Sequence, residues 1–282
     1  MDEGIPPELR RNRMLSLVRE REFMRVADLS TIFGISEVTV RTDLGLLADQ
    51  GALQRVHGGA IVRDPELRLE RSFEEALDEY AAEKAGIGRH GAGTIRSGET
   101  IILDVGTSTT AIAKALVARS DLTDVTVFTS SLTIALELEA AIPRITVVIT
   151  GGTLRPKQHS LVDPMAGFIF ENVNASTAFI GCNGVHPDAG ITNVNLPEAE
   201  MKRKMVAAAQ RTVVVADGSK LGNISVAKVA DLSDIDQLIT GPSAPPEVVA
   251  KLAGRGVAVE IAESRISGTT RSPAPVDNGG NT

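Results

Sequence analysis

The sequence predicts an α/β chain in which a small helical domain precedes a large domain built on a mainly parallel sheet. From Thr100 onward, short aliphatic runs alternate with segments of helical spacing, which is typical of a sheet covered by helices on both faces. The chain before Pro65 instead contains amphipathic helical segments and a short glycine-rich hairpin. Aromatic residues are only 3% of the 282 residues, so the core is expected to be aliphatic.

Composition restricts the class of protein. Apolar residues make up 43% and charged residues 23%, ordinary values for a soluble globular protein, and no apolar run approaches the roughly 20 residues of a membrane span. The acidic N-terminus lacks the features of a signal peptide. The one cysteine, Cys182, has no partner for an internal disulfide and is expected to fill the core. We therefore predict a cytoplasmic protein without membrane association. The net charge of −7 argues only weakly against nucleic acid.

Three helices are predicted in the N-terminal part. The first, over residues 8–20, has an apolar stripe and a basic outer face with Arg10, Arg11, Arg13 and Arg19. A second short helix covers residues 26–33 and stops before Gly34. Ser36 is a suitable N-cap for a third helix that runs to about Gln50.

The third helix has two different surfaces. Val40, Leu44 and Leu47 follow the i, i+4, i+7 spacing of a core stripe. Two helices joined by a glycine turn, the second with Arg and Thr facing outward, describe a helix-turn-helix whose second helix would lie in a DNA major groove. The alternative is a three-helix domain that binds protein. The outward residues are Val38, Arg41, Thr42 and Gly45.

A glycine-centred hairpin follows this helix. Residues 53–56 and 60–63 are predicted as two short strands on either side of His57-Gly58-Gly59. This is the shape of a DNA-binding wing, in which Arg55, His57 and Arg63 would face phosphate.

The third helix and the wing form one extended motif, from Ser36-Glu37-Val38-Thr39-Val40-Arg41-Thr42-Asp43-Leu44 to Arg55-Val56-His57-Gly58-Gly59-Ala60. It resembles the signature of the DeoR family of bacterial transcriptional repressors. The resemblance implies double-stranded operator DNA as a partner, with Ser36 and Thr39 joining the outward residues. The family usually has two consecutive arginines, and Thr42 replaces the second. Since a bidentate arginine contributes about 1–3 kcal/mol of base discrimination, operator preference is expected to differ from that of a typical member.

The start of the large domain contains a predicted anion-binding turn. Ile101 to Leu103 and Val105 indicate a buried strand, followed by Gly106, four hydroxyl residues and an apolar run of helical spacing. Gly106 permits close approach or a positive φ, and the free N–H groups of the next helix attract an anion, usually phosphate. The alternative is a capped helix start with nothing bound. The hydroxyls expected to add donors are those of Thr107, Ser108, Thr109 and Thr110.

Three further polar turns are predicted at the same edge of the sheet, because ligands bind at the carboxyl ends of parallel strands. Strands at 125–128, 145–149 and 213–216 lead to these turns. Their polar or flexible residues are Ser130 and Ser131, Gly151 and Gly152, and Asp217 and Lys220. The remaining predicted elements are helices over 71–95, 132–140, 198–209 and 248–252 and strands over 177–180, 238–239 and 257–261.

This half carries further family motifs, among them Asp104-Val105-Gly106-Thr107-Ser108-Thr109-Thr110, Glu198-Ala199-Glu200-Met201-Lys202 and Ala216-Asp217-Gly218-Ser219-Lys220. They resemble the DeoR effector domain, which is similar in fold to ribose-5-phosphate isomerase and glucosamine-6-phosphate deaminase. The resemblance implies a phosphorylated sugar effector. It implies that Thr107 to Thr110 hold phosphate, that Lys84 and Lys220 supply countercharge, and that Asp104, Glu198 and Asp217 accept hydrogen bonds from sugar hydroxyls.

Some of these residues have a second interpretation. Asp217 is equally suited to an Asx turn, and Lys84 and Lys220 to solvated surface positions. Two positions also depart from the family pattern: Ser130 replaces a frequent Asn, and Asp163 replaces a frequent Gly before Pro164. If Asp163 faces the pocket, its charge disfavours phosphate nearby.

Together these patterns predict four segments: a winged helix-turn-helix over 8–63, a joint over 64–70, an effector domain over 71–263 and a disordered tail over 264–282, where apolar residues are scarce. The predicted function is a transcriptional regulator that acts as a homodimer or homotetramer. It is expected to repress, and activation is the alternative, because the sign depends on where the operator lies relative to a promoter. The alternative is a sugar-phosphate isomerase or deaminase with an added DNA-binding head and acid–base groups. Because a wing and a recognition helix have no purpose in a simple enzyme, we expect no catalytic residue, metal or cofactor.

Overall fold

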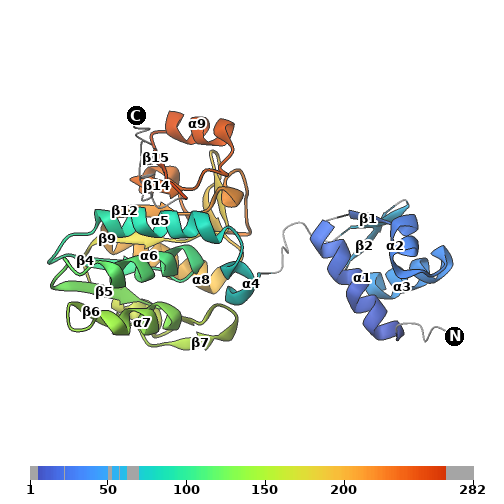
Figure 1. Cartoon of the computed structure of the whole chain (residues 1–282), viewed down its shortest axis with the longest axis horizontal. Helices are drawn as coiled ribbons and strands as arrows, with labels where there is room; N and C mark the ends of the chain where they lie inside the picture. Colours follow the sequence, from blue (N-terminus) through green and yellow to red (C-terminus); the bar gives the residue numbers. More distant parts are fainter. Residues whose placement is uncertain (1–5, 22, 50–52, 57, 62–69, 265–282) are drawn as a thin grey trace, which may run out of the picture. The chain divides into compact units, whose positions relative to one another are not determined.

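The computed structural model describes residues 6–21, 23–49, 53–56, 58–61 and 70–264. The chain divides into two compact units, Met1–Glu70 and Arg71–Thr282, and each is described by itself (Figure 1). Within the described ranges, no helix has the length and apolar character that a bilayer span requires. Except for Ser264, the predicted tail over 264–282 lies outside the described residues.

The N-terminal unit combines three helices with a small antiparallel sheet, in the strand order β1-β3-β2. The three helices confirm the three predicted segments. The sequence also predicts the β2–β3 hairpin, but not β1, because three residues are too few to show an alternating pattern. The bounds are α1 Pro7–Arg21, β1 Phe23–Arg25, α2 Val26–Phe33, α3 Glu37–Asp49, β2 Gln54–Val56 and β3 Gly59–Ile61.

The turn between α2 and α3 is fixed by two residues. Gly34 ends α2 with a φ of 63°, a left-handed conformation that favours glycine. Ser36 caps α3, because its Oγ accepts a hydrogen bond from the backbone N–H of Thr39 at 3.2 Å. The predicted core stripe is confirmed, since Val40, Leu44 and Leu47 are all buried in one apolar cluster.

The second unit is built on a seven-stranded parallel sheet in the order β15-β14-β12-β9-β4-β5-β6. This confirms the predicted fold class. The strand order reverses beside β4, which lies between β5 and β9, and such a reversal opens a crevice at the carboxyl ends of the strands. The strands are β4 Thr100–Leu103, β5 Val125–Thr129, β6 Ile145–Ile149, β9 Ala175–Ile180, β12 Ala209–Val215, β14 Gln237–Thr240 and β15 Ala258–Ile261.

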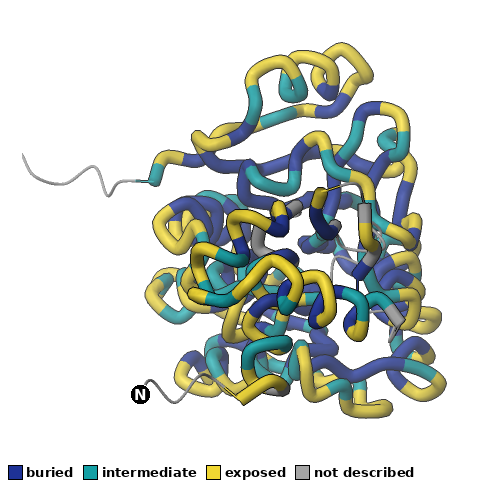
Figure 2. Tube along the Cα trace, turned by 90° about the vertical axis from the view of Figure 1, so that its right-hand side faces the viewer, coloured by how far each residue is buried: buried dark blue, intermediate teal, exposed yellow. Residues whose placement is uncertain are grey.

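Helices cover both faces of this sheet (Figure 1). Ile101 and Leu103 of β4 pack with Ile112 of α6 in one core, whereas Ile102 packs with Met201 of α8 in another. Figure 2 shows buried and exposed residues alternating along many helices, as expected when one helical face lies on a sheet. The helices are α4 Phe73–Leu77, α5 Ala81–Thr94, α6 Thr107–Ala118, α7 Leu132–Leu138, α8 Leu196–Ala207 and α9 Pro246–Gly254.

Two smaller sheets lie beyond the predicted elements. One is an antiparallel hairpin of β7 and β8, and the other has the order β10-β11-β13. Cys182 packs against the apolar cluster below the second sheet, and burial raises the pKa of its thiol to about 12, in agreement with a core-filling role. The bounds are β7 Thr153–Arg155, β8 Ser160–Val162, β10 Gly184–His186, β11 Gly190–Asn193 and β13 Ala227–Ala230, with short 3-10 helices η1 Glu139–Ala141, η2 Pro156–Gln158, η3 Ala166–Ile169, η4 Gly218–Lys220 and η5 Leu232–Asp234.

The prediction of one helix over 71–95 is wrong, because the segment forms two helices, α4 and α5. Ser72 and Glu75 make a capping box at the start of α4, and Tyr80 interrupts the helical path with a φ of 51°. The spacing of Phe73, Leu77 and Tyr80 in the sequence predicts one apolar helical face, but Tyr80 is exposed. The capping box was visible as Ser-x-x-Glu, but the alanine-rich composition of the segment favoured a single helix.

Candidate DNA interface and effector site

The outer surface of α3 has the residues expected of a recognition helix. Val38 is 69% exposed, Arg41 and Thr42 are exposed, and Thr39 and Gly45 are half-buried. The Thr42 hydroxyl donates to the carbonyl of Val38 at 3.0 Å. Because this donor is already used within the helix, the side chain that replaces the second family arginine offers DNA its methyl group and a hydroxyl oxygen that can accept a hydrogen bond.

Arg41 is oriented by a neighbour on the same helix. Its Nη2 lies 2.5 Å from Oε2 of Glu37, and the two side chains are 51% and 46% exposed. Such an exposed i, i+4 pair contributes only about 0.3–0.5 kcal/mol, so DNA phosphate or a guanine edge can compete for the guanidinium. Arg41 thus remains available while it points toward the N-terminal end of α3.

Asp43 attaches α3 to α1. Its carboxylate is buried and accepts from Nε of Arg10 at 2.7 Å, with Nη1 of Arg11 at 3.6 Å. The sequence places Arg10 and Arg11 on a basic outer face, and the structure corrects this, because both arginines turn toward Asp43. Arg13 is exposed as expected.

The wing brings one arginine to the recognition helix. A β-carbon added to Gly45 of α3 would lie 3.9 Å from Nη1 of Arg55 in β2, so the exposed Arg55 side chain reaches the surface of α3. The other predicted wing contacts, His57 and Arg63, lie outside the described residues. Arg41, Gly45 and Arg55 therefore form one continuous surface on the N-terminal unit.

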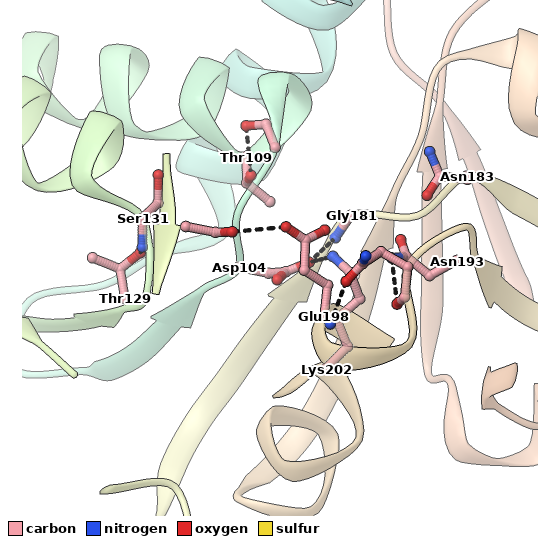
Figure 3. Close-up of polar contacts among 12 residues, drawn as sticks. Asp104, Thr109, Thr129, Ser131, Gly181, Asn183, Asn193, Glu198 and Lys202 are labelled. Atoms are coloured by element: carbon pink, nitrogen blue, oxygen red, sulfur yellow. Dashed lines mark hydrogen bonds and ion pairs between the residues drawn. The ribbon is translucent and has the colours of Figure 1, made fainter. Parts of the chain in front are cut away.

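In the second unit, a buried ion pair lies where β4 ends. Asp104 and Lys202 of α8 are joined through Oδ2 and Nζ, with side chains only 1% and 3% exposed. The same Oδ2 accepts the backbone N–H of Gly181, after β9, at 2.9 Å (Figure 3). Oδ1 of Asp104 is buried and has no hydrogen-bond partner among the described residues. Burial raises the pKa of the Asp104 carboxyl, while the charge of Lys202 lowers it.

Glu198 lies one helical turn before Lys202 and is also buried. Its Oε1 accepts from Nη1 of Arg155 in β7 and from Oγ of Ser160 in β8, the latter at 2.7 Å. Asn195 caps the helix, because its Oδ1 accepts the N–H of Glu198 at 3.1 Å. Glu198 is close enough to raise the pKa of Asp104 further, so the two acids belong to one site (Figure 3).

The predicted anion turn has the expected backbone but only some of the expected donors. Gly106 precedes α6 with a φ of 140° and has no side chain with which to cap the helix. The hydroxyls of Thr109 and Thr110 donate back to the Gly106 carbonyl at 2.9 and 2.8 Å, so these two donors are used within the helix. The N–H groups of the first turn and the hydroxyls of Thr107 and Ser108 remain as donors.

Residues of the turns after β5 and β6 have roles within the fold: Ser131 caps a helix, and Gly152 permits a close backbone approach. Ser131 caps α7 by accepting the N–H of Ile134 at 3.2 Å, and Ser130 is buried beside it. Gly151 and Gly152 have φ values of 69° and 115°. A β-carbon on Gly152 would lie 2.5 Å from the carbonyl oxygen of Val162, so this glycine permits the hairpin to approach the sheet edge.

Asp163, one of the departures from the family pattern, is engaged locally. Its Oδ2 lies 3.1 Å from Nζ of Lys204, and its Oδ1 accepts the N–H of Gly167 at 2.7 Å. The same Lys204 Nζ lies 3.1 Å from Oε1 of Glu171, so one lysine is shared by two carboxylates. The effect of Asp163 on phosphate stays a prediction.

A second group of charged residues surrounds the turn after β12. Asp217 is buried, and its Oδ1 accepts the N–H of Ser219 at 3.1 Å, which is the Asx turn given as its alternative. Lys84 is buried rather than solvated, and its Nζ donates to the carbonyls of Ala76 and Glu79. Burial lowers the pKa of Lys84, Asp217 raises it and Lys220 lowers it, so these three charges lie close together.

The preceding residue, Glu83, is a contact that the sequence does not predict. Its two oxygens accept the N–H groups of Gly218, at 3.2 Å, and Ser243, at 2.6 Å. Lys202, Arg155 and Ser160 are also missed. For Lys202 the sequence signal is its spacing: Glu198, Lys202 and Met205 follow i, i+4, i+7 and so share one face of α8. The structure buries all three.

The edge of the sheet offers residues suited to the hydroxyl groups of a polyol phosphate and residues suited to its phosphate. Buried carboxylates next to lysine and arginine suit vicinal hydroxyl groups, which both donate and accept hydrogen bonds. An uncapped helix N-terminus with two free hydroxyls suits an anion. Within the described residues no cluster of His, Cys, Asp or Glu has the arrangement of a metal site.

Comparisons with known proteins agree with this arrangement. The profile of the DeoR-like helix-turn-helix domain matches residues 10–66, and that of the DeoR C terminal sensor domain matches residues 79–242. The HTH-type transcriptional regulator GolR of Listeria innocua is 32% identical over 257 residues, 91% of this chain and 99% of that protein. The putative aga operon transcriptional repressor of Escherichia coli O157:H7 is 31% identical over 251 residues, 89% of this chain and 92% of that protein.

Two solved structures are also similar to parts of the chain. The sorbitol operon regulator SorC of Klebsiella pneumoniae has 13% identity and a TM-score of 0.39, with coverage of 86% of this chain and 97% of that one. Ribose 5-phosphate isomerase A of Methanocaldococcus jannaschii has 16% identity and a TM-score of 0.36, with coverage of 49% and 52%. On the evidence of both domain matches and of relatives aligned over nearly their whole length, the chain belongs to the DeoR family of transcriptional regulators.

Proposed function

We propose that this regulator is a cytoplasmic repressor that binds double-stranded operator DNA through α3 and the wing, and that a phosphorylated sugar at the carboxyl edge of the sheet releases it. The observation that carries the proposal is the buried cluster of Asp104, Lys202 and Glu198 beside the uncapped start of α6. Buried charges are expensive to maintain, and this cluster lies where parallel sheets bind ligands.

In this site the phosphate lies at the N-terminus of α6, where Thr107 and Ser108 donate hydrogen bonds. The sugar hydroxyls lie toward Asp104, whose Oδ1 lacks a partner among the described residues. Lys84 of α5 and Lys220 of the turn after β12 supply countercharge. The roles of Gly106, Gly151 and Gly152 are to bring backbone close to the ligand.

On DNA, the regulator acts as a homodimer or homotetramer on repeated half-sites. Arg41 contacts a base edge in the major groove, and Val38, Thr39, Thr42 and Gly45 form the surrounding surface. Half-sites must be about 34–36 Å apart, or a multiple of that distance, so a small change in the placement of the two helix-turn-helix units weakens binding.

The testing experiment is a thermal-shift screen of the full-length protein with glucose 6-phosphate, fructose 1-phosphate, glycerol 3-phosphate and their unphosphorylated parents. A ligand at about 100 times its Kd adds about 2.7 kcal/mol of stability. We expect a shift from a phosphorylated compound, none from its parent, and release of an operator fragment by the same compound in fluorescence anisotropy. A shift from the parent alone would contradict a phosphate site.

We also infer that the protein does not catalyse a sugar-phosphate reaction. The inference is supported by the relatives, which are named transcriptional regulators or repressors. The purified protein should therefore leave each phosphorylated sugar of the screen unchanged, as measured by NMR of the mixture. Formation of an isomer or of a deaminated product from an amino-sugar phosphate would overturn this inference.

A further inference from the structure

We infer that the β7–β8 hairpin links the effector site to the segment that leads to the DNA-binding unit, with Gln158 and His159 as positioning residues. The effector itself rests on the proposed function, but the link does not. The last residue pair before the tip of the hairpin contacts Glu198 in the site. The tip itself contacts the first residues of the second unit, directly after the predicted joint over 64–70.

At the site end, Glu198 holds both strands of the hairpin through one oxygen. Oε1 accepts from Nη1 of Arg155 in β7 and from Oγ of Ser160 in β8. Arg155 and Ser160 are paired across the hairpin, so they move together. A hydroxyl group that draws the Glu198 carboxylate toward itself therefore acts on both strands through Oε1.

The tip of the hairpin, which directly follows the Arg155–Ser160 pair, makes three contacts with the start of α4 and the segment just before it. Nε2 of Gln158 donates to the carbonyl of Arg71 at 2.5 Å, and Nε2 of His159 lies 2.6 Å from Oε1 of Glu74. The His159 ring also packs edge-to-face on Phe73, with centroids 5.8 Å apart. Phe73 is buried, so the tip completes the local core of α4.

The connection between the two ends is short and conformationally restricted. Only η2 and His159 lie between the paired residues Arg155 and Ser160, and His159 has a φ of 49°. A shift of the Arg155–Ser160 pair is therefore transmitted to the tip rather than absorbed by a long loop. Packed elements of this kind carry coupling when they have two alternative arrangements that a ligand can bias.

Lys84 attaches the same segment to the other side of the site. Its Nζ donates to the carbonyls of Ala76, in α4, and Glu79, just after it, while Asp217 and Lys220 act on its charge. Helix α4 and the residues next to it are therefore held from two sides, by the hairpin tip and by Lys84. A ligand that draws Glu198 and Lys84 toward itself changes both.

The first test measures the link without any ligand, by hydrogen–deuterium exchange of the full-length protein. Glu198→Gln weakens the hold on Arg155 and Ser160, and we expect amides of α4 to exchange at least about threefold faster, although α4 does not touch Glu198. Exchange in β14 serves as the reference for global stability. The control variant is His90→Ala. It breaks the His90–Glu260 pair, a surface His–Glu pair like that of His159 and Glu74 but away from the hairpin. Unchanged exchange in α4 of Glu198→Gln would overturn the inference.

The second test measures operator release, using whichever of glucose 6-phosphate, fructose 1-phosphate and glycerol 3-phosphate stabilises the wild type. His159→Ala should keep the thermal shift, because His159 does not touch the ligand, but reduce release from tenfold or more to about twofold or less, where typical couplings are about 5–150-fold. His159→Gln, which can still bond Glu74, should restore part of the response, and His90→Ala should respond fully.

The outcomes separate the two ideas. Full release by the His159→Ala variant would overturn the link and leave the effector site standing. A set of three phosphates that stabilises nothing counts against the proposed function, and the exchange experiment then decides the link by itself.

Discussion

Replacement of Lys202 by Met should destabilise the second unit strongly, because it leaves the Asp104 carboxylate buried without its cation. Both side chains are at most 3% exposed, so water cannot compensate. Breaking a buried pair by removing one partner costs about 3–5 kcal/mol. Gly181 still donates to Asp104, which favours the lower part of that range. At about 2–4 °C per kcal/mol for a unit of this size, the melting temperature should fall by at least roughly 6 °C.

The loss should depend on pH with a definite sign. Burial raises the pKa of Asp104 above its usual range and Lys202 lowers it, so removal of Lys202 raises the folded-state pKa further. A carboxyl whose pKa is higher in the folded than in the unfolded state, about 3.9 for Asp, stabilises the fold below the unfolded pKa. That stabilisation is lost as the pH rises through the folded pKa. The deficit of Lys202→Met should thus be larger at pH 8 than at pH 5.

The assay is chemical denaturation of the full-length protein at both pH values, with Lys251→Met on exposed α9 as the matched control. The control should stay within about 0.5 kcal/mol of wild type. The double variant Asp104→Asn with Lys202→Met should regain most of the lost stability, because no buried charge remains. A loss below about 1 kcal/mol, or an equal loss at both pH values, would refute the reasoning.

Three further predictions concern the DNA interface and the anion turn. Arg41→Ala should weaken specific operator binding by about 1–3 kcal/mol in anisotropy and leave the thermal shift by effector intact; unchanged affinity would remove α3 from the interface. Gly45→Ala should raise the stability of the N-terminal unit by up to about 1 kcal/mol, because its β-carbon would be 3.9 Å from the nearest atom, Nη1 of Arg55; a lower melting temperature would contradict that. Ser108→Glu should abolish the thermal shift by phosphorylated sugars, and full induction in that variant would exclude the turn from the site.

Periodicity was sufficient for most of the fold because each central strand is a short aliphatic run next to a helical segment. The stretch predicted over 213–216 is an example: it has no polar interruption, and Val213 to Val215 form the second half of β12, an inner strand of the sheet. The strands β10 and β11 were not predicted, since they are three and four residues long and contain glycine and polar residues. Their pairing is decided by tertiary packing against β13.

The sequence predicted the site residues that lie at the carboxyl ends of strands. It did not predict those whose position depends on which face of a helix packs against the sheet. Asp104 follows a buried strand and precedes glycine, so its place at the sheet edge follows from sequence. Lys202 lies among five charged residues of α8, and which of them face inward depends on how the helix packs. Similarly, the hydroxyl-rich turn predicted four ligands, but Thr109 and Thr110 bond the backbone instead, a local competition that threonine side chains often win.

Under the proposed function, Asp104 acts in both the stability of the fold and the recognition of the sugar. Its Oδ2 is fully used by Lys202 and Gly181, whereas Oδ1 is buried without a partner among the described residues. An unsatisfied buried acceptor costs about 1–3 kcal/mol, and a sugar hydroxyl that donates to Oδ1 recovers that energy only in the bound state. A ligand that lacks this one hydroxyl should therefore lose about 1.5–3 kcal/mol, the contribution of a hydrogen bond to a charged group. Because only a ligand with a hydroxyl at the right position can satisfy Oδ1, the unsatisfied oxygen favours that ligand over an analogue without the hydroxyl.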